Sequence, residues 1–197
     1  ISCNPVAVNS NAATLTVNSS PAVTTQPASA TTCEGSNAQF CVTASGAGLS
    51  YQWQVNTSGC TGGTWTDITA ANSNCLTVTA VTSSMNNYGY RCIVSGTCTP
   101  SVTTDCASLT VNTAAAITTQ PADVSGCTGG NASFSVTATG AGLTYNWQVS
   151  TDGGATWNNV SPAVATATLT LTNVTAAMNN NQYRCQVGGT CSAGLTN

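Results

Sequence analysis

The ionisable side chains of this chain are too few and too scattered to build a catalytic site. Its 197 residues include two arginines, five acids, no lysine and no histidine, so that charged residues make up only 4%. General acid–base catalysis needs such groups held close together. The acids instead stand singly, at Glu34, Asp67, Asp105, Asp123 and Asp152. The sequence therefore predicts a protein that is not an enzyme and that uses no cofactor.

Cysteine is the one reactive residue type that is abundant. The chain holds 11 cysteines, without a Cys-x-x-Cys pair and without a histidine that could complete a zinc site. This usage indicates disulfides formed in an oxidising compartment, so we expect a secreted or cell-surface protein with no bound metal. Because 11 is odd, at least one cysteine is expected to be free or bonded to another chain.

Charge and hydropathy also restrict the partners. Two cations in a chain of net charge −3 cannot neutralise a row of phosphates, so nucleic acid is not expected to bind. No apolar run approaches the roughly 18 residues that cross a membrane, so no membrane insertion is expected. Charge usually keeps soluble monomers dispersed. A chain this poor in charge is better suited to packing against neighbours in an assembly.

The elements that position these residues repeat along the chain with a period of about 94. Thr24–Ala28 recurs as Thr118–Ala122, and Gly46–Trp53 recurs with two substitutions as Gly140–Trp147, both after 94 residues. A fixed period of this length indicates tandem copies of one structural unit. We therefore expect two similar domains.

Within one repeat, apolar and polar residues alternate as they do in β-strands. Ala38, Phe40 and Val42 alternate with Gln39 and Cys41, which puts the apolar residues on one face and Cys41 on the other. Short strands separated by turns rich in Gly, Asn and Ser predict an all-β sandwich. Cys41 is therefore expected to point away from the core.

A strand with a tryptophan, followed later by a Tyr-x-Cys strand, is typical of immunoglobulin domains. The motifs that carry this pattern are Thr24–Pro27, Tyr51–Gln54, Trp65, Tyr90–Cys92 and Leu109–Asn112. Over essentially its whole length the chain resembles the tandem bacterial immunoglobulin-like repeats of secreted and surface proteins of Bacteroidota. The resemblance implies extracellular placement and a role in adhesion, stalks or fibres, but it names no ligand.

Cysteine pairing departs from the immunoglobulin pattern, because no inward-facing cysteine lies opposite the Tyr-x-Cys strand. Cys92 and Cys185 therefore need other partners or remain buried thiols. The expected pairs are Cys33 with Cys92 and Cys127 with Cys185, and the further candidate pairs are Cys60 with Cys75 and Cys98 with Cys106. Other connectivities stay open, since spacing alone does not determine pairing.

The segment Ser150–Trp157 fits the S-x-D-x-G-x-T-W Asp-box that occurs on hairpins of sialidase propellers. Propellers carry one such box in each blade, and the corresponding segment of the first repeat, Asn56–Trp65, is degenerate. A single box predicts a tight hairpin turn rather than a propeller.

The two arginines, Arg91 and Arg184, occupy equivalent outward positions between a tyrosine and a cysteine. One interpretation gives them structural hydrogen bonds or stacking contacts within the domain. The other makes them anchors of contacts between subunits.

The repeats lie in a strand-permuted frame. Residues 19–112 are expected to form a complete domain, and residues 113–197 a domain that stops before its own last strand. Residues 1–18 carry an orphan copy of that strand, in which Ala13, Leu15 and Val17 match the Ala-x-Leu-x-Val pattern of residues 107–111.

A sandwich without its last strand would expose apolar surface and an unpaired edge. We therefore expect residues 1–18 of one copy to complete the second sandwich of another copy by donor-strand complementation. Cys3 would then lie near Cys191 of the neighbouring chain, where a disulfide could form. The alternative is one long tandem-repeat chain in which the strand follows in the same polypeptide.

The predicted function is a structural subunit or segment of an extracellular fibre that self-associates into a homopolymer. The first alternative is a cell-surface adhesin whose repeats act as a stalk or bind a glycan or another surface ligand. A further alternative is an accessory module of a secreted enzyme. Self-association of the purified chain favours the fibre, whereas an exposed cluster of aromatic and polar loop residues favours the adhesin.

Overall fold

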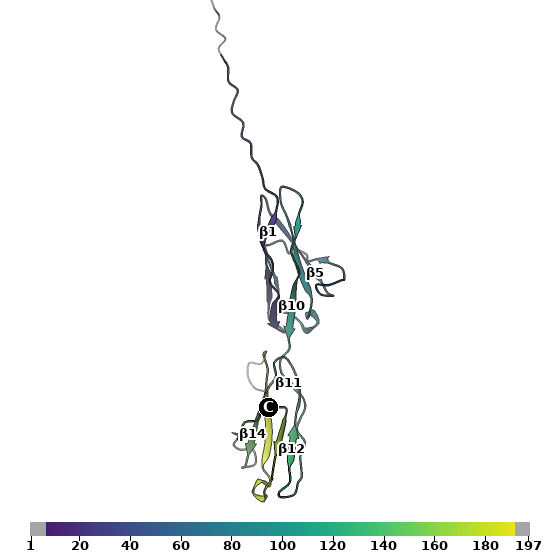
Figure 1. The fold of residues 1–197 in the computed structure, drawn as a ribbon, viewed down its shortest axis with the longest axis vertical. Coiled ribbons are helices and arrows are strands. Elements are labelled where there is room, and N and C mark those ends of the chain that lie inside the picture. The colour runs from purple at the N-terminus through teal and green to yellow at the C-terminus, as the bar shows by residue number, and fades with distance from the viewer. Residues whose placement is uncertain (1–6, 192–197) are drawn as a thin grey trace, which may run out of the picture.

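The computed structural model describes residues 7–191, which form two β-sandwiches lying end to end (Figure 1). Apart from two short 3-10 turns, every regular element is a strand. The link between the sandwiches, residues 113–115, is short. The predicted all-β fold with tandem sandwiches is confirmed.

The first sandwich contains ten strands and one 3-10 turn. They are β1 (Ala22–Thr25), β2 (Ala30–Cys33), β3 (Ala38–Cys41), β4 (Thr43–Ser45), β5 (Ser50–Asn56), β6 (Thr66–Asp67), β7 (Cys75–Val78), η1 (Ser83–Met85), β8 (Gly89–Ser95), β9 (Val102–Thr103) and β10 (Ala107–Asn112). One sheet has the order β2-β10-β8-β5-β6 with β9 beside β8, and the pairs β1-β4 and β3-β7 form the opposite layer.

The second sandwich repeats most of these elements. They are β11 (Ala116–Thr119), β12 (Ala132–Ser135), β13 (Thr137–Thr139), β14 (Thr144–Ser150), β15 (Asn158–Asn159), β16 (Thr168–Leu171), η2 (Ala176–Met178) and β17 (Gln182–Gly188). Their pairings are β11-β13, β12-β16 and β15-β14-β17.

The core of the first sandwich forms where the two layers meet. Trp53 is fully buried, and its indole Nε1 donates to the carbonyl oxygen of Ser73 at 2.9 Å. Phe40 stacks on Tyr90 with ring centroids 4.6 Å apart. Strand β3 alternates as predicted, because Ala38 and Phe40 are buried whereas Cys41 is exposed. The alternation with a period of two residues therefore predicts the inward face of β3 correctly.

Strand β10 closes the first sandwich. It pairs antiparallel with β8, where Ala107 lies opposite Tyr90, and parallel with β2, where Asn112 lies opposite Cys33. Its residues Ala107, Leu109 and Val111 are 1%, 0% and 7% exposed. One short strand therefore supplies an apolar face to the core and the hydrogen-bond partner that β2 needs.

The second sandwich lacks this closing strand among the residues that the structure describes. Strand β17 pairs with β14 along one edge, and no described strand pairs with its other edge. Residues 124–127, the counterpart of β2, do not form a strand. This difference follows from the pairing in the first sandwich, where β2 is hydrogen-bonded to β10 alone.

The importance of β10 can be measured by comparing two leucines at repeat-equivalent positions. We expect Leu109→Ala to lower the free energy of unfolding of the first sandwich by about 2–5 kcal/mol, because it leaves a cavity at a fully buried site. Leu15→Ala, at a side chain that is 86% exposed, should change it by less than about 0.5 kcal/mol.

Urea denaturation of dilute protein, followed by tryptophan fluorescence, measures both changes. Equal effects of the two substitutions would show that β10 does not close the first sandwich.

Candidate functional site

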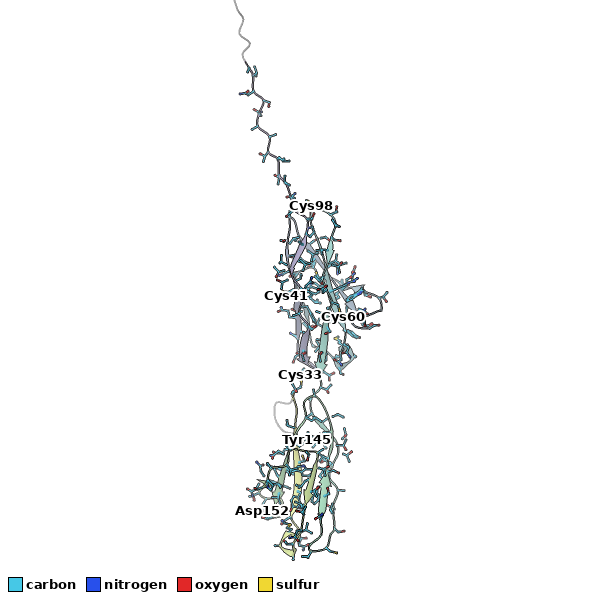
Figure 2. The ribbon with its side chains drawn as sticks, in the orientation of Figure 1. Cys33, Cys41, Cys60, Cys98, Tyr145 and Asp152 are labelled. Carbon is cyan, nitrogen blue, oxygen red and sulfur yellow. A yellow bond between two sulfur atoms is a disulfide. The ribbon has the colours of Figure 1, made fainter. Side chains whose placement is uncertain are left out.

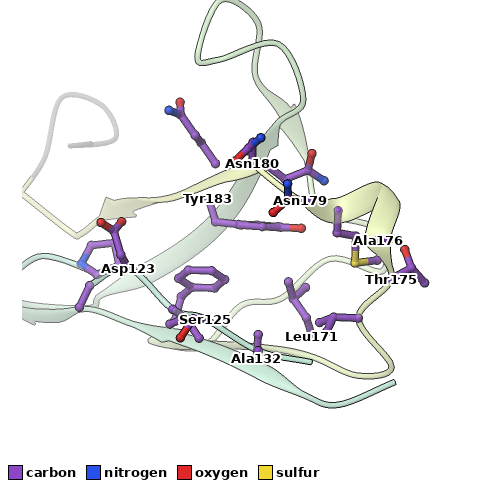
Figure 3. Close-up of a pocket in the computed structure, with 18 of the residues that line it drawn as sticks. Asp123, Ser125, Ala132, Leu171, Thr175, Ala176, Asn179, Asn180 and Tyr183 are labelled. Atoms are coloured by element: carbon purple, nitrogen blue, oxygen red, sulfur yellow. The ribbon is translucent and has the colours of Figure 1, made fainter. Parts of the chain in front are cut away.

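An open groove of about 960 Å³ runs along the second sandwich beside β17 (Figure 3). Residues 121–126 form one side, and η2 with residues 179–183 forms the other. Figure 3 shows Tyr183, Leu171 and Ala132 in the middle of the groove, with Asp123 towards one end. The apolar lining includes Val124, Ala132, Phe134, Leu171, Val174 and Met178. The groove is therefore suited to an extended strand with apolar side chains.

The same side chains are covered in the first sandwich. Phe40 and Tyr90 are 1% and 3% exposed, whereas their counterparts Phe134 and Tyr183 are only partly buried. The rings nevertheless stack in the same way, with centroids 4.6 Å apart in the first sandwich and 4.9 Å apart in the second. The two cores are therefore alike. The groove takes the position in the second sandwich that β10 takes in the first.

The backbone partners of β10 identify the polar contacts that such a strand makes. Leu109 N donates to the carbonyl oxygen of Tyr88 at 2.9 Å, and Asn87 N donates to the carbonyl oxygen of Leu109 at 2.8 Å. Val111 N donates to Oδ1 of Asn86 at 2.9 Å. Three consecutive residues, 86–88, thus hold the strand in register.

The second sandwich presents the same three positions to the groove. They are Asn179, Asn180 and Asn181, and all three line it. Asn180 adopts a left-handed backbone with φ 68°, as Asn87 does with φ 70°. Asparagine tolerates this conformation better than most residues. The strand-holding turn is therefore already formed beside the groove.

The predicted donor residues lie at the other end of the molecule. The described part of the leading segment, residues 7–20, is exposed throughout and forms no strand. Leu15 and Val17 are 86% and 83% exposed. Figure 1 shows this segment leaving the first sandwich at the end far from the second sandwich. The structure therefore does not bring Ala13, Leu15 and Val17 to the groove of their own chain.

The disulfides differ from every predicted pair. The structure contains Cys33–Cys191, Cys41–Cys75 and Cys60–Cys106. The expected pairs Cys33–Cys92, Cys127–Cys185, Cys60–Cys75 and Cys98–Cys106 are wrong, because one or both members either bond elsewhere or are free.

The bridge Cys33–Cys191 joins the two sandwiches, with Cα atoms 5.6 Å apart. Cys33 ends β2 at the tip of the first sandwich (Figure 2), whereas Cys92 lies buried in the middle of β8. The four pairs predicted within one chain each lie inside a single repeat, whereas this bridge joins the two repeats. The predicted disulfide between Cys3 and Cys191 is also wrong, since Cys191 is bonded to Cys33. Cys3 itself lies outside the described residues.

The other two bridges lie within the first sandwich. Cys41 and Cys75 are directly opposite each other in the β3-β7 register, so the outward direction of Cys41 was the signal that could have identified its partner. The Cys60–Cys106 bridge crosses beside Gly89, where an added Cβ would lie 2.7 Å from Cys106 Sγ. Glycine at this position leaves room for the sulfur.

Four of the described cysteines are free: Cys92, Cys98, Cys127 and Cys185. Cys92 and Cys185 are buried thiols, as one of the two interpretations expected. Burial raises the pKa of Cys92 to about 11 and also raises the pKa of Cys185, so neither is a reactive thiolate at neutral pH. Cys127 is exposed and Cys98 is partly exposed.

Each arginine stacks on a tryptophan of its own sandwich. Arg91 lies 4.2 Å from the ring centroid of Trp65, and its Nε donates to Oε1 of Gln54 at 2.8 Å. Arg184 lies 4.3 Å from the ring centroid of Trp157. The intramolecular stacking and hydrogen bonds are thus present, and contact with another subunit stays a prediction.

The Asp-box forms the hairpin between β14 and β15. Asp152 accepts hydrogen bonds from Ser150 Oγ at 2.7 Å and from the backbone N and Oγ1 of Thr156 at 2.9 and 2.6 Å. These bonds, led by those from Thr156, lower the pKa of Asp152 to about 2. Trp157 Nε1 closes the turn on the carbonyl oxygen of Gly154 at 3.1 Å. The motif builds a turn, as predicted.

Residues 7–191 contain no group of three or more His, Cys, Asp or Glu side chains that could hold a metal ion. Within the same range, no helix has the length and apolarity needed to span a bilayer.

Comparison with solved structures supports the fold seen here. An I-band fragment of titin superposes with a TM-score of 0.66 over 90% of this chain and 63% of that chain, at 16% identity. Rst D1-D2 superposes with a TM-score of 0.59 over 90% of this chain and 95% of that one, at 15% identity. The chain is therefore a tandem of immunoglobulin-like β-sandwiches.

Sequence comparison adds one relative. The chain is 34% identical over 171 residues to Endoglucanase C of Cellulomonas fimi, an alignment that covers 85% of this chain and 15% of that protein. No family model matches the chain. The similarity thus concerns a small part of a much longer protein.

The Asp152 turn predicts a dependence of stability on pH. Its pKa is about 2 in the folded chain and 3.8 ordinarily, so the ionised carboxylate stabilises the fold above about pH 4 and loses this effect as the pH falls towards 2. We expect the Asp152 carboxyl to titrate near pH 2 in a ¹³C NMR experiment. Asp152→Asn should lower the Tm at pH 7 and flatten its dependence between pH 4 and 2.

A titration midpoint near 3.8 in the folded protein would contradict the hydrogen-bonded turn. Asp123→Asn, at an exposed acid of the same sandwich, serves as the matched control.

Proposed function

We propose that this chain is a structural subunit of an extracellular fibre, in which the leading strand of one copy completes the second sandwich of the next. The observation that supports this proposal is the match between an open groove and an exposed leading segment in the same chain. The groove is lined by Phe134 and Tyr183, whose counterparts in the first sandwich are buried in one core cluster with the apolar residues of β10. The leading segment carries the same Ala-x-Leu-x-Val pattern as β10.

The register of the docked strand follows from the first sandwich. Ala107 lies opposite Tyr90 on β8, so Ala13 lies opposite Tyr183 on β17. Because β10 is parallel to β2, residues 15–18 lie beside residues 124–127. Docking thereby gives residues 124–127, the counterpart of β2, a strand to pair with.

Apolar burial and backbone pairing supply the driving force. Burying Leu15 and Val17, which are 86% and 83% exposed, stabilises the joint by about 1.5–3 kcal/mol for each side chain. The backbone bonds to residues 179–181 contribute about 0.5–1.5 kcal/mol each. Strand addition of this kind takes its affinity from the main chain and its specificity from alternate side chains.

The placement of donor and acceptor makes the assembly open-ended. The leading segment leaves the first sandwich at the end far from the second sandwich (Figure 1). The groove lies in the second sandwich. Each added copy therefore presents a new groove, and such a heterologous contact builds a filament when its rotation does not close a ring. If the repeats continue in one polypeptide, the following strand fills the groove in the same register.

The remaining features agree with an extracellular structural role without catalysis. Three disulfides form and persist in oxidising compartments such as the cell surface. The acids are scattered and two cations stack on tryptophans, which leaves them poorly placed for acid–base chemistry. A bacterial surface origin is consistent with the resemblance of the repeats.

A second candidate function is a carbohydrate-associated module, either in an adhesin or as an accessory domain of a secreted enzyme. The similarity to part of Endoglucanase C favours it. Sedimentation of the protein with insoluble cellulose and a glycan array test this function directly. If the protein binds cellulose or a glycan while it remains monomeric, the carbohydrate-associated module is favoured over the fibre subunit.

The strand proposal predicts different effects at adjacent residues. The double variant Leu15→Asp/Val17→Asp should lose self-association by 100-fold or more, since a buried carboxylate opposes docking by several kcal/mol. Thr16→Asp is the matched control, because its counterpart Thr110 is exposed on β10. Light scattering and negative-stain electron microscopy measure polymer length for the three proteins.

Monomeric wild-type protein at high concentration would refute the fibre, and equal losses in Thr16→Asp and the double variant would refute the register. A peptide of residues 11–18 should shorten the wild-type polymer by filling the groove. The same peptide with Leu15→Asp should leave the polymer length unchanged.

A further inference from the structure

The disulfide Cys33–Cys191 between the two sandwiches of one chain shows how two sandwiches are joined where a closing strand ends. Both of its cysteines meet at one residue, Asn112, the last residue of β10. Cys33 lies opposite Asn112 in the β2-β10 register. Cys191 Sγ lies 3.5 Å from the carbonyl oxygen of Asn112. The end of β10 thus lies where the tips of the two sandwiches meet, and the bridge forms there.

At the leading end of the chain, Cys98 and Asn18 repeat the contact between Cys191 and Asn112. Cys98 is the repeat counterpart of Cys191, and its thiol donates to the carbonyl oxygen of Asn18 at 3.5 Å. Asn18 is the counterpart of Asn112. The next backbone contact is also shared, since Ala47 N donates to Ser19 O and Ala141 N to Thr113 O, both at 3.2 Å. Figure 2 shows Cys98 at this end of the first sandwich and Cys33 at the opposite end.

The trailing end has the other half. Cys127 is the repeat counterpart of Cys33, 94 residues later. It is exposed and free, and it follows directly on the stretch Val124–Gly126 that lines the groove. When a leading strand docks in the register of β10, its Asn18 lies beside Cys127, as Asn112 lies beside Cys33.

We propose that Cys127 of one copy and Cys98 of the next copy form a disulfide that locks each joint of the fibre. This inference rests on the proposed strand docking, which brings the two thiols to the same asparagine. The internal bridge shows that this arrangement allows a Cα–Cα separation of 5.6 Å, within the range that disulfides require. Every joint along the fibre, within and between chains, then has the same covalent link.

The reaction needs an external disulfide as the oxidant, either glutathione disulfide or the active-site disulfide of a thiol–disulfide oxidoreductase. One protein thiolate attacks that disulfide, forms a mixed disulfide and releases one thiol. The second protein thiolate then attacks the mixed disulfide and releases the other thiol. The Cys127–Cys98 bond forms while the oxidant takes up two electrons and two protons to become two thiols.

The experiment uses the full chain with Cys3→Ser, so that the cysteine outside the described residues does not contribute. Polymerised protein is oxidised with glutathione disulfide, alkylated, and run on a denaturing gel without reductant. We expect a ladder at multiples of 19.6 kDa that collapses to the monomer on reduction. Cys98→Ser and Cys127→Ser should each abolish the ladder.

Mixing the two single variants should give a covalent dimer and nothing larger, since each supplies one half of a single joint. Cys92→Ser, at a buried thiol, is the matched control and should keep the ladder. Peptide mass mapping without reduction should identify the Cys98–Cys127 cross-link. A ladder that survives Cys98→Ser or Cys127→Ser, or a cross-link between other cysteines, would overturn the inference.

Electron microscopy separates this inference from the proposed fibre. Filaments of the Cys98→Ser and Cys127→Ser variants should still form without covalent links, and should dissociate at lower urea concentrations than oxidised wild-type filaments. Filaments without any ladder would reject the disulfide and retain the strand docking. A ladder that persists in Leu15→Asp/Val17→Asp, which cannot dock its strand, would reject the strand docking as the cause of the cross-link.

Discussion

Closure of the first sandwich by its last strand, β10, is the interaction on which the architecture depends. In the first sandwich, β10 buries Leu109 and Val111 in the same core cluster as Phe40 and Tyr90, and it is the strand to which β2 is hydrogen-bonded. Burial and pairing are therefore coupled, because the segment that would form β2 has no other edge to join. The second sandwich shows the consequence directly, with an open groove and no strand at residues 124–127.

The joint between the sandwiches extends this principle along the molecule. The link after β10 is only residues 113–115, so a strand docked in one sandwich necessarily places the next sandwich at its tip. The Cys33–Cys191 bridge and the contacts of Ala141 with Thr113 then restrain the two bodies. The two sandwiches of one chain are thus joined by a short link, a disulfide and a backbone hydrogen bond.

The two arginines and Asp152 make their contacts within their own sandwiches. The two arginines stack on Trp65 and Trp157 and bond to Gln54 and Gln148, which covers the tryptophan rings on the outer face of each sandwich. Asp152 is likewise held by local hydrogen bonds of its hairpin. The charged side chains thus stabilise local structure.

The sequence by itself determined the all-β class, the repeat, the inward face of β3 and the outward direction of Cys41, because a period of two residues depends only on local backbone geometry. The repeat also predicts that Ala13, Leu15 and Val17 form an unpartnered strand, because they match the template of β10; in the structure these residues are exposed and form no strand. Disulfide connectivity was decided only by the tertiary structure. Cys33 and Cys191 are 158 residues apart in sequence and meet because the short link places two sandwich tips together, a relation that no local pattern encodes.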